Sequence, residues 1–273
     1  MDMLENVLIK WSKANDDAHS LLSEINKFCD EHPINLIPTP RDGRLGVNFA
    51  YDMKDYAIPL KRWSIDLGGI IYSLRSALDN LIFVCAQQHF NPPKKPGKLQ
   101  FPIFDNELDF EARATQTILQ LPEKIATLLK QIQPFQRQYE EGVPSTDPLI
   151  LLNWMSNHDK HRMPIPFLVP PNQINLSSTC QFETEDDAKA NIHPDITVHI
   201  DPIEHGNLFI EYKTKHPVVM IEGTVKIIAK VQFKTPFGNM VLADAIKKMI
   251  YYCALVINNF ALALGEADLN KAI

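Results

Sequence analysis

The segment from residue 62 to residue 88 constrains the fold more than any other part of the chain. At about 100° per residue, its apolar side chains fall on one narrow stripe of a helix, formed by Leu67, Ile71, Leu74, Leu78, Leu81 and Cys85. Phe83 and Val84 lie off this stripe, so the second half of the helix is apolar nearly all round. Helices of that kind are buried, and we expect this one at the centre of the fold.

Other segments carry weaker patterns. Helical spacing predicts further helices over residues 1–30, 107–120, 123–133, 148–161 and 240–264. Pro122 and Pro148 mark two of the starts, and Pro164 stops one helix. Beyond Arg162 the pattern changes to short β-like runs, predicted at 174–182, 196–200, 208–212, 218–221 and 224–233. Two earlier strands are expected at 44–51 and 56–60, the second with Pro59 at an edge or an end.

These elements predict an α+β protein with a helical bundle core, an inserted antiparallel β region and a closing C-terminal helix. The expected division is a helical body with short N-terminal strands over 1–163, a β region over 164–238, and a helix over 239–273 that returns to the body. The chain has 20 Pro against 10 Gly. The prolines gather at 33–40, 92–102 and 164–171, where we expect stiff connections between elements.

Composition excludes several classes of protein. The chain has 273 residues, of which 45% are hydrophobic and 22% charged, and this excludes a disordered tail or a fibrous repeat. The net charge of −6 argues against a protein that coats nucleic acid by bulk charge. The N-terminus does not resemble a signal peptide, and the apolar stretch 246–264 is too short and too polar for a membrane span. With four widely spaced cysteines, expected to be reduced and mostly buried, the sequence predicts a cytoplasmic protein without a membrane partner.

Charged residues occupy two places where apolar ones are expected. Arg75 and Asp79 lie one turn apart beside the apolar stripe of the central helix, and Asp159, His161 and Arg162 end another helix. A charge beside a core stripe is costly unless it is paired. The simplest arrangement is a crossed one, in which Arg75 pairs with Asp159, and Asp79 pairs with Arg162 or His161.

These charges allow two interpretations. They could form a structural network that fixes the register of the two helices. They could instead form a polar pocket, in which an arginine holds a phosphate bidentately and His161 acts as general acid or base.

Other chemical signals are weak. His158 and His161 are compatible with two metal ligands on one helix, but the sequence offers no second group of ligands with clear spacing, so we expect no metal. No nucleotide-binding or nucleophile motif of the Walker A, GxGxxG or GxSxG type occurs in the sequence, and no cofactor is expected.

Four short motifs together resemble a widespread family of uncharacterised bacterial proteins. They are LRSALD at 74–79, FPI at 101–103, QP at 133–134, and Asn157 followed by DKHR at 159–162. The resemblance covers about residues 40–165. The family's helix typically has His-Asn before the Leu and His after the Asp, whereas this chain has Tyr72-Ser73 and Asn80.

A second, weaker resemblance is to HEPN domains, helical bundles that often act as metal-independent ribonucleases in toxin and defence systems. Their signature is an Arg, a polar residue and a His a few residues later on one helix. Here Arg75 is followed by Ser76 and Asp79, and His161 lies on another helix. The resemblance implies RNA as substrate, Arg75 and Arg162 at the scissile phosphate, His161 as the proton carrier, and a homodimer. The competing expectation is a non-enzymatic binding or sensor protein, in which the charges brace the bundle.

Overall fold

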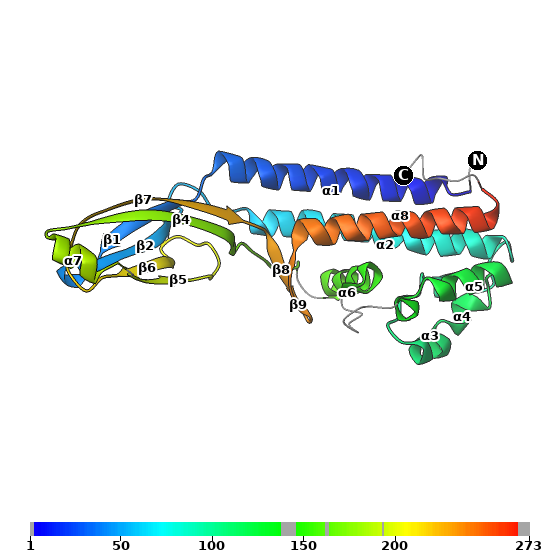
Figure 1. The fold of residues 1–273 in the computed structure, drawn as a ribbon. Helices are drawn as coiled ribbons and strands as arrows, with labels where there is room; N and C mark the ends of the chain where they lie inside the picture. Colours follow the sequence, from blue (N-terminus) through cyan, green and yellow to red (C-terminus); the bar gives the residue numbers. More distant parts are fainter. Residues whose placement is uncertain (1–2, 138–145, 162–163, 193, 267–273) are drawn as a thin grey trace. The chain divides into compact units, whose positions relative to one another are not determined.

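The structure, a computed structural model, describes residues 3–137, 146–161, 164–192 and 194–266. It shows an α+β protein with antiparallel sheets and a long C-terminal helix (Figure 1). The chain divides into two compact units. The helical unit comprises residues 1–24, 61–166 and 235–273, and the β unit comprises residues 25–60 and 167–234.

The two N-terminal strands belong to the β unit, whereas the sequence placed them with the helical body. β1 (Asn35–Pro40) pairs with β2 (Gly46–Asp52), and β2 pairs with β6 (Leu208–Lys213). The alternation of polar and apolar residues within a strand shows which face of the strand is buried. It does not show which distant strand supplies the backbone hydrogen bonds. The expected boundary was therefore wrong for residues 25–60.

The helices follow the predicted order. They are α1 (Glu5–Glu31), α2 (Leu60–Gln87), α3 (Glu107–Arg113), α4 (Thr115–Ile118), α5 (Glu123–Gln131), α6 (Pro148–His161) and α8 (Leu242–Leu264). The segment expected as one helix over 107–120 is divided at Ala114 into α3 and α4. Asn106 caps α3 by accepting a hydrogen bond from the Asp109 N–H at 2.8 Å.

The predicted apolar stripe of α2 is confirmed as core. All six of its residues are buried, and so is Trp63, whose indole N–H donates to Glu24 on α1. Outside the stripe α2 is partly exposed, at Ile65 and Tyr72 in its first half and at Phe83 in its second half. Composition alone does not decide burial, since much of any protein surface is apolar.

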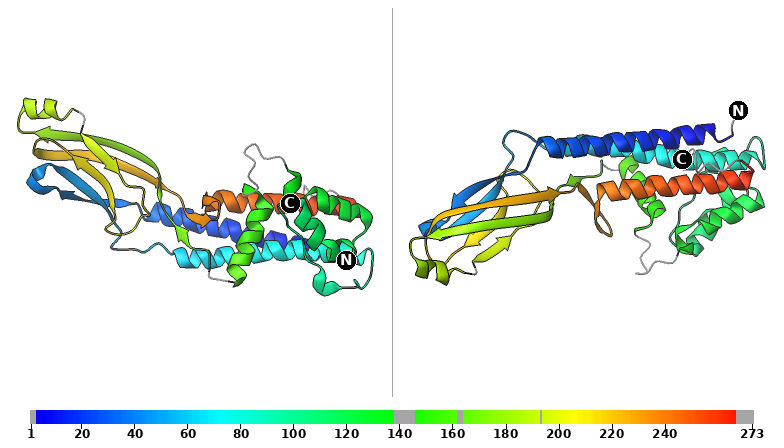
Figure 2. Two further views of the ribbon diagram at one scale, coloured as in Figure 1. Left: turned by 90° about the horizontal axis from the view of Figure 1, so that it is seen from below. Right: turned by 45° about the horizontal axis from the view of Figure 1, so that its top comes forward.

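α8 completes the helical unit. It packs against α5 and α6 and runs alongside α2 in both views (Figures 1 and 2). The side chains predicted for its inner face are buried from Ile246 to Phe260. The Trp11 indole on α1 donates to the Ile250 carbonyl at 3.2 Å, so the first and last helices of the chain are in direct contact.

The β unit contains a four-stranded antiparallel sheet in the order β1-β2-β6-β5, with β5 at Asp195–Val198. A long ribbon of β4 (Pro171–Phe182) and β7 (Val218–Ala229) lies over this sheet (Figures 1 and 2). The short helix α7 (Glu185–Ala190) follows β4. β3 (Phe167–Leu168) pairs with β8 (Gln232–Thr235), and β9 (Gly238–Val241) precedes α8.

Two strand predictions were wrong. The runs at 218–221 and 224–233 form one strand to Ala229, because β4 pairs with β7 past Gly223, which lies opposite Ser178. No strand covers 56–60, and α2 already begins at Leu60, directly after Pro59. A proline just before a helix fits a helix start as well as a strand end.

Candidate functional site

Arg75 and Asp79 together hold the backbone of one residue, Phe101. The Asp79 carboxylate Oδ1 accepts from the Phe101 N–H at 2.8 Å, and Arg75 Nη2 donates to the Phe101 carbonyl at 2.7 Å. Arg75 Nη2 also lies 3.4 Å from Asp79 Oδ1, one turn along α2. The two side chains thus satisfy both backbone groups of an extended segment that has no strand partner.

Gln133 extends this support to the next residues of the same segment. Its side-chain amide is fully buried and donates to the carbonyls of Pro102 at 2.9 Å and Leu129 at 3.1 Å. Its oxygen accepts from the Phe104 N–H at 3.1 Å. Pro102 has no N–H, so the carbonyl is its only backbone group that needs a partner. The QP motif therefore supports the backbone of the FPI motif and of the residue that follows it through hydrogen bonds of the Gln133 side chain.

The supported segment forms one wall of a pocket of about 730 Å³ in the helical unit. The other walls come from α2, α3, α4 and α6 (Figure 1). Its polar side chains include Arg75, Asp79, Arg113, Asn153, Ser156 and Asn157. A volume of this size lies within the usual range for small-molecule sites.

The Arg75 guanidinium is the most unusual group in this pocket. Only 11% of the side chain is exposed, and Nη1 is buried without a hydrogen-bond partner among the residues that the structure describes. Burial lowers the pKa of Arg75, and the neighbouring Asp79 carboxylate opposes that shift. An unpaired buried donor costs about 1–3 kcal/mol, so an acceptor that reaches Nη1 would be bound favourably.

Two amides on α6 offer further hydrogen-bonding capacity. Asn153 and Asn157 line the pocket one helical turn apart, and neither side chain has a hydrogen bond within the described part of the chain. Ser156, which also lines the pocket, is buried between them. Of these three residues, the sequence analysis identified only Asn157. Asn153 and Ser156 could have been found as polar residues at helical spacing on an otherwise apolar helix.

Asp159 lies elsewhere, and the predicted pair with Arg75 is wrong. A Cβ at position 68 would lie only 2.9 Å from Asp159 Oδ1, so the carboxylate is packed against Gly68 on α2. Gly68 precedes Arg75 by two helical turns, about 10 Å along the axis. The missing side chain at Gly68 allows α6 to approach α2 here, and this approach sets the register of the two helices.

The remaining predicted residues are described incompletely. Arg162 lies outside the described residues, as does the side chain of His161, whose backbone ends α6. The expected pairing of Asp79 with Arg162 or His161 therefore also lies outside them. The described partners of Asp79 are Phe101 and Arg75.

The pocket offers hydrogen bonds and charge but little for proton transfer. None of the described lining residues is a histidine, and within the described chain no three His, Cys, Asp or Glu side chains converge on a metal-sized site. By length and composition α2 could cross a membrane, but 56% of its most apolar window is buried inside the protein. A core helix passes the same test.

Known proteins add no family assignment to this geometry. No family model, no curated protein and no solved structure matches the chain.

Proposed function

We propose that the helical unit is a binding module for a small polar molecule that carries an anionic group, such as a phosphate monoester. The observation that supports this proposal is that Arg75 lines the pocket while its buried Nη1 has no partner among the described residues. Arginine binds phosphate oxygens through charge-assisted hydrogen bonds. Asn153 and Asn157 would bind the neutral part of the ligand.

Two of the charged residues at this site, Arg75 and Asp79, already have a structural task. Arg75 Nη2 and Asp79 hold the Phe101 backbone, which favours a binding or sensing role over a nuclease in which both groups act on substrate. The lining also includes Lys98 and Arg113 as cations and Asp105 and Asp109 as anions. A bound ligand would therefore contact both positive and negative side chains. Specificity would come from the positions of these side chains and not from the net charge of the pocket.

Titration calorimetry with AMP and adenosine tests this proposal. The two ligands differ by the phosphate alone, and we expect AMP to bind about tenfold more tightly, since a hydrogen bond to a charged group is worth roughly 1.5–3 kcal/mol. Asn157→Leu should abolish binding of both ligands, because it blocks the wall without touching the Phe101 supports. His158→Leu, one residue further on α6 and not in the lining, should bind as the wild type does. Equal affinities for AMP and adenosine would contradict the proposal.

RNA cleavage is the second candidate, supported by one observation. Arg75 faces an open pocket on one side, and α6, which carries Asn157 in the wall, ends one turn later at His161. We would incubate total RNA with the wild type, with Arg75→Ala, and with Arg75→Lys as the variant that keeps the positive charge. Cleavage by the wild type that both variants lose while still folded would favour a HEPN-like nuclease. RNA left intact by the wild type would remove this candidate.

A further inference from the structure

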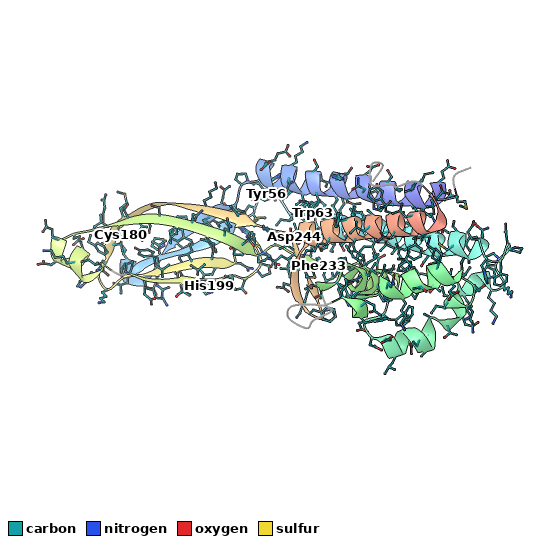
Figure 3. All side chains as sticks on the ribbon, turned by 45° about the vertical axis from the view of Figure 1, so that its right-hand side comes forward. Tyr56, Trp63, Cys180, His199, Phe233 and Asp244 are labelled. Atoms are coloured by element: carbon teal, nitrogen blue, oxygen red, sulfur yellow. The ribbon has the colours of Figure 1, made fainter. Side chains whose placement is uncertain are left out.

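A second cavity, of about 550 Å³, lies inside the β unit and is unrelated to the Arg75 pocket. Its lining residues come from the four-stranded sheet and from the β4–β7 ribbon, which lies over that sheet (Figures 1 and 2). Figure 3 labels Cys180 on the ribbon and His199 just after β5. Protein interiors are normally close-packed, so an unfilled space of this volume between two β layers is a candidate ligand site.

The strand register shows that one face of the sheet forms the floor. Pro38 on β1 lies opposite Phe49 on β2, and Phe49 lies opposite Ile210 on β6. Leu36, Val47 and Tyr212 share this face, because side chains at every second position point the same way. On the ribbon side, Leu176 and Ser178 are alternate, half-buried positions of β4. Most of the described lining side chains are apolar, and the polar ones include Asn35, Arg44 and Ser178.

The cavity opens at the edge of the sheet. β1 is an edge strand, and consecutive residues at its start (Ile34–Leu36) and at the start of β7 (Val218–Ile221) line the cavity. Consecutive strand residues point to opposite faces of a sheet, so a cavity that touches all of them lies at the edge of the strand. We infer that the cavity opens to solvent between these two strand edges. Pro38 and Pro40 lie on β1, and prolines at an edge discourage pairing with a further strand.

Among the described residues that line the cavity, Arg44 is the only charged one. It is exposed, has no ion pair within the described part of the chain, and adopts a left-handed backbone with φ of 56°. Such a conformation is uncommon for a residue other than glycine. The Tyr212 hydroxyl, on the strand position that pairs with Val47, already interacts with the side chains of Ser178 and Cys180. Among the described lining residues, the charged group without an ion pair is therefore a cation.

We propose that the β unit binds a fatty-acid-like monocarboxylate, with its hydrocarbon chain between the two β layers and its carboxylate at Arg44. The mostly apolar side chains of the walls match the chain, and a single arginine with no acidic residue among the described lining residues matches one negative charge. Each buried methylene should raise the affinity about fourfold, until the cavity is full.

Calorimetric titration of the full-length protein with decanoate and decanol tests this inference, because the two probes differ only in the head group. We expect decanoate to bind at least tenfold more tightly than decanol. Arg44→Gln should remove that preference, while Lys226→Gln, which loses an equal charge at an exposed β7 residue outside the lining, should keep it.

A pair of neighbouring substitutions on β4 tests the location. Ser178→Phe places a ring inside the cavity and should abolish decanoate binding, whereas Ser177→Phe places the same ring on the exposed face and should leave it unchanged. Circular dichroism and the thermal midpoint show whether each variant is folded. Undetectable decanoate binding to the wild type, or undiminished binding to folded Ser178→Phe, would overturn the inference. Equal binding of decanoate and decanol would overturn the role of Arg44.

Discussion

Arg75 lines the pocket, and its two terminal nitrogen atoms differ in their surroundings. Nη2 donates to the Phe101 carbonyl, and Nη1 is buried without a partner among the described residues. Sequence reasoning identified Arg75 and Asp79 as misplaced charges on an apolar helix, which is correct. It assigned them a charged partner on another helix, whereas their described partner is the Phe101 backbone. A backbone group carries no signal in the residue types, so this partner could not be predicted.

The Gln133 side chain gives a prediction at the residue scale. Gln133→Leu should lower the free energy of unfolding by roughly 3 kcal/mol, because it leaves the buried Pro102 carbonyl and Phe104 N–H without partners. Urea unfolding followed by tryptophan fluorescence measures this change. Gln131→Leu, at an exposed position two residues earlier, is the control and should change stability by less than about 0.5 kcal/mol. Similar losses in both variants would contradict the role assigned to Gln133.

The α2–α6 contact is set by a glycine that the sequence does not distinguish from its neighbour. Gly68 faces Asp159, while a Cβ at Gly69 would meet nothing within 4 Å. The helices themselves were predictable from apolar spacing, but their relative register depends on close approach at a single position. Because the sequence does not show this close approach, it predicted an Arg75–Asp159 pair. In the structure Asp159 instead packs against Gly68, and the pair is not formed.

This difference predicts opposite effects of two adjacent substitutions. Gly69→Ala should stabilise the protein by about 1 kcal/mol, because alanine is the better helix former and no atom is in the way. Gly68→Ala should destabilise it, since the new methyl group collides with Asp159. Adding Asp159→Ala should recover part of that loss. Thermal unfolding of the three variants measures the effects, and equal shifts for both alanines would contradict the packing.

The outer face of the four-stranded sheet predicts a dependence of stability on pH. Lys213 above all, then His199 and Arg41, hold the pKa of Glu211 below its ordinary value of 4.5. Their contribution to stability is therefore present above pH 4.5 and is lost as the pH falls through the lowered pKa. Glu211→Gln should be less thermally stable than the wild type at pH 7, and the difference should shrink as the pH falls below 4.5. Glu204→Gln, at an exposed position without a described ion pair, should match the wild type at both.

At the scale of the whole molecule, each unit contains its own pocket and its own core. The chain enters the β unit twice, over residues 25–60 and 167–234, so neither segment completes the four-stranded sheet alone. The α+β class was predictable, since helical and alternating segments are separated along the chain. The assignment of 25–60 was not, because it depends on the pairing of β2 with β6 across most of the sequence.

The reactivity of the cysteines tests which parts of the molecule are buried. Cys85 and Cys253 are buried, and burial raises the pKa of each thiol to about 12, whereas Cys29 is exposed, against expectation. Iodoacetamide at pH 8 should modify Cys29 in the native protein, and Cys85 and Cys253 only after unfolding. Peptide mass spectrometry identifies the sites. Rapid modification of Cys85 in the folded protein would contradict this core.

The proposed binding site depends most on Arg75 Nη1, which has no partner among the described residues. Nitrogen-15 NMR of the arginine side chains during titration with AMP and with adenosine observes this group directly. We predict that AMP shifts the Arg75 guanidinium resonances, that adenosine leaves them in place, and that Asn157→Leu prevents the shift. Arg75 resonances that stay unchanged at saturating AMP would contradict the binding site.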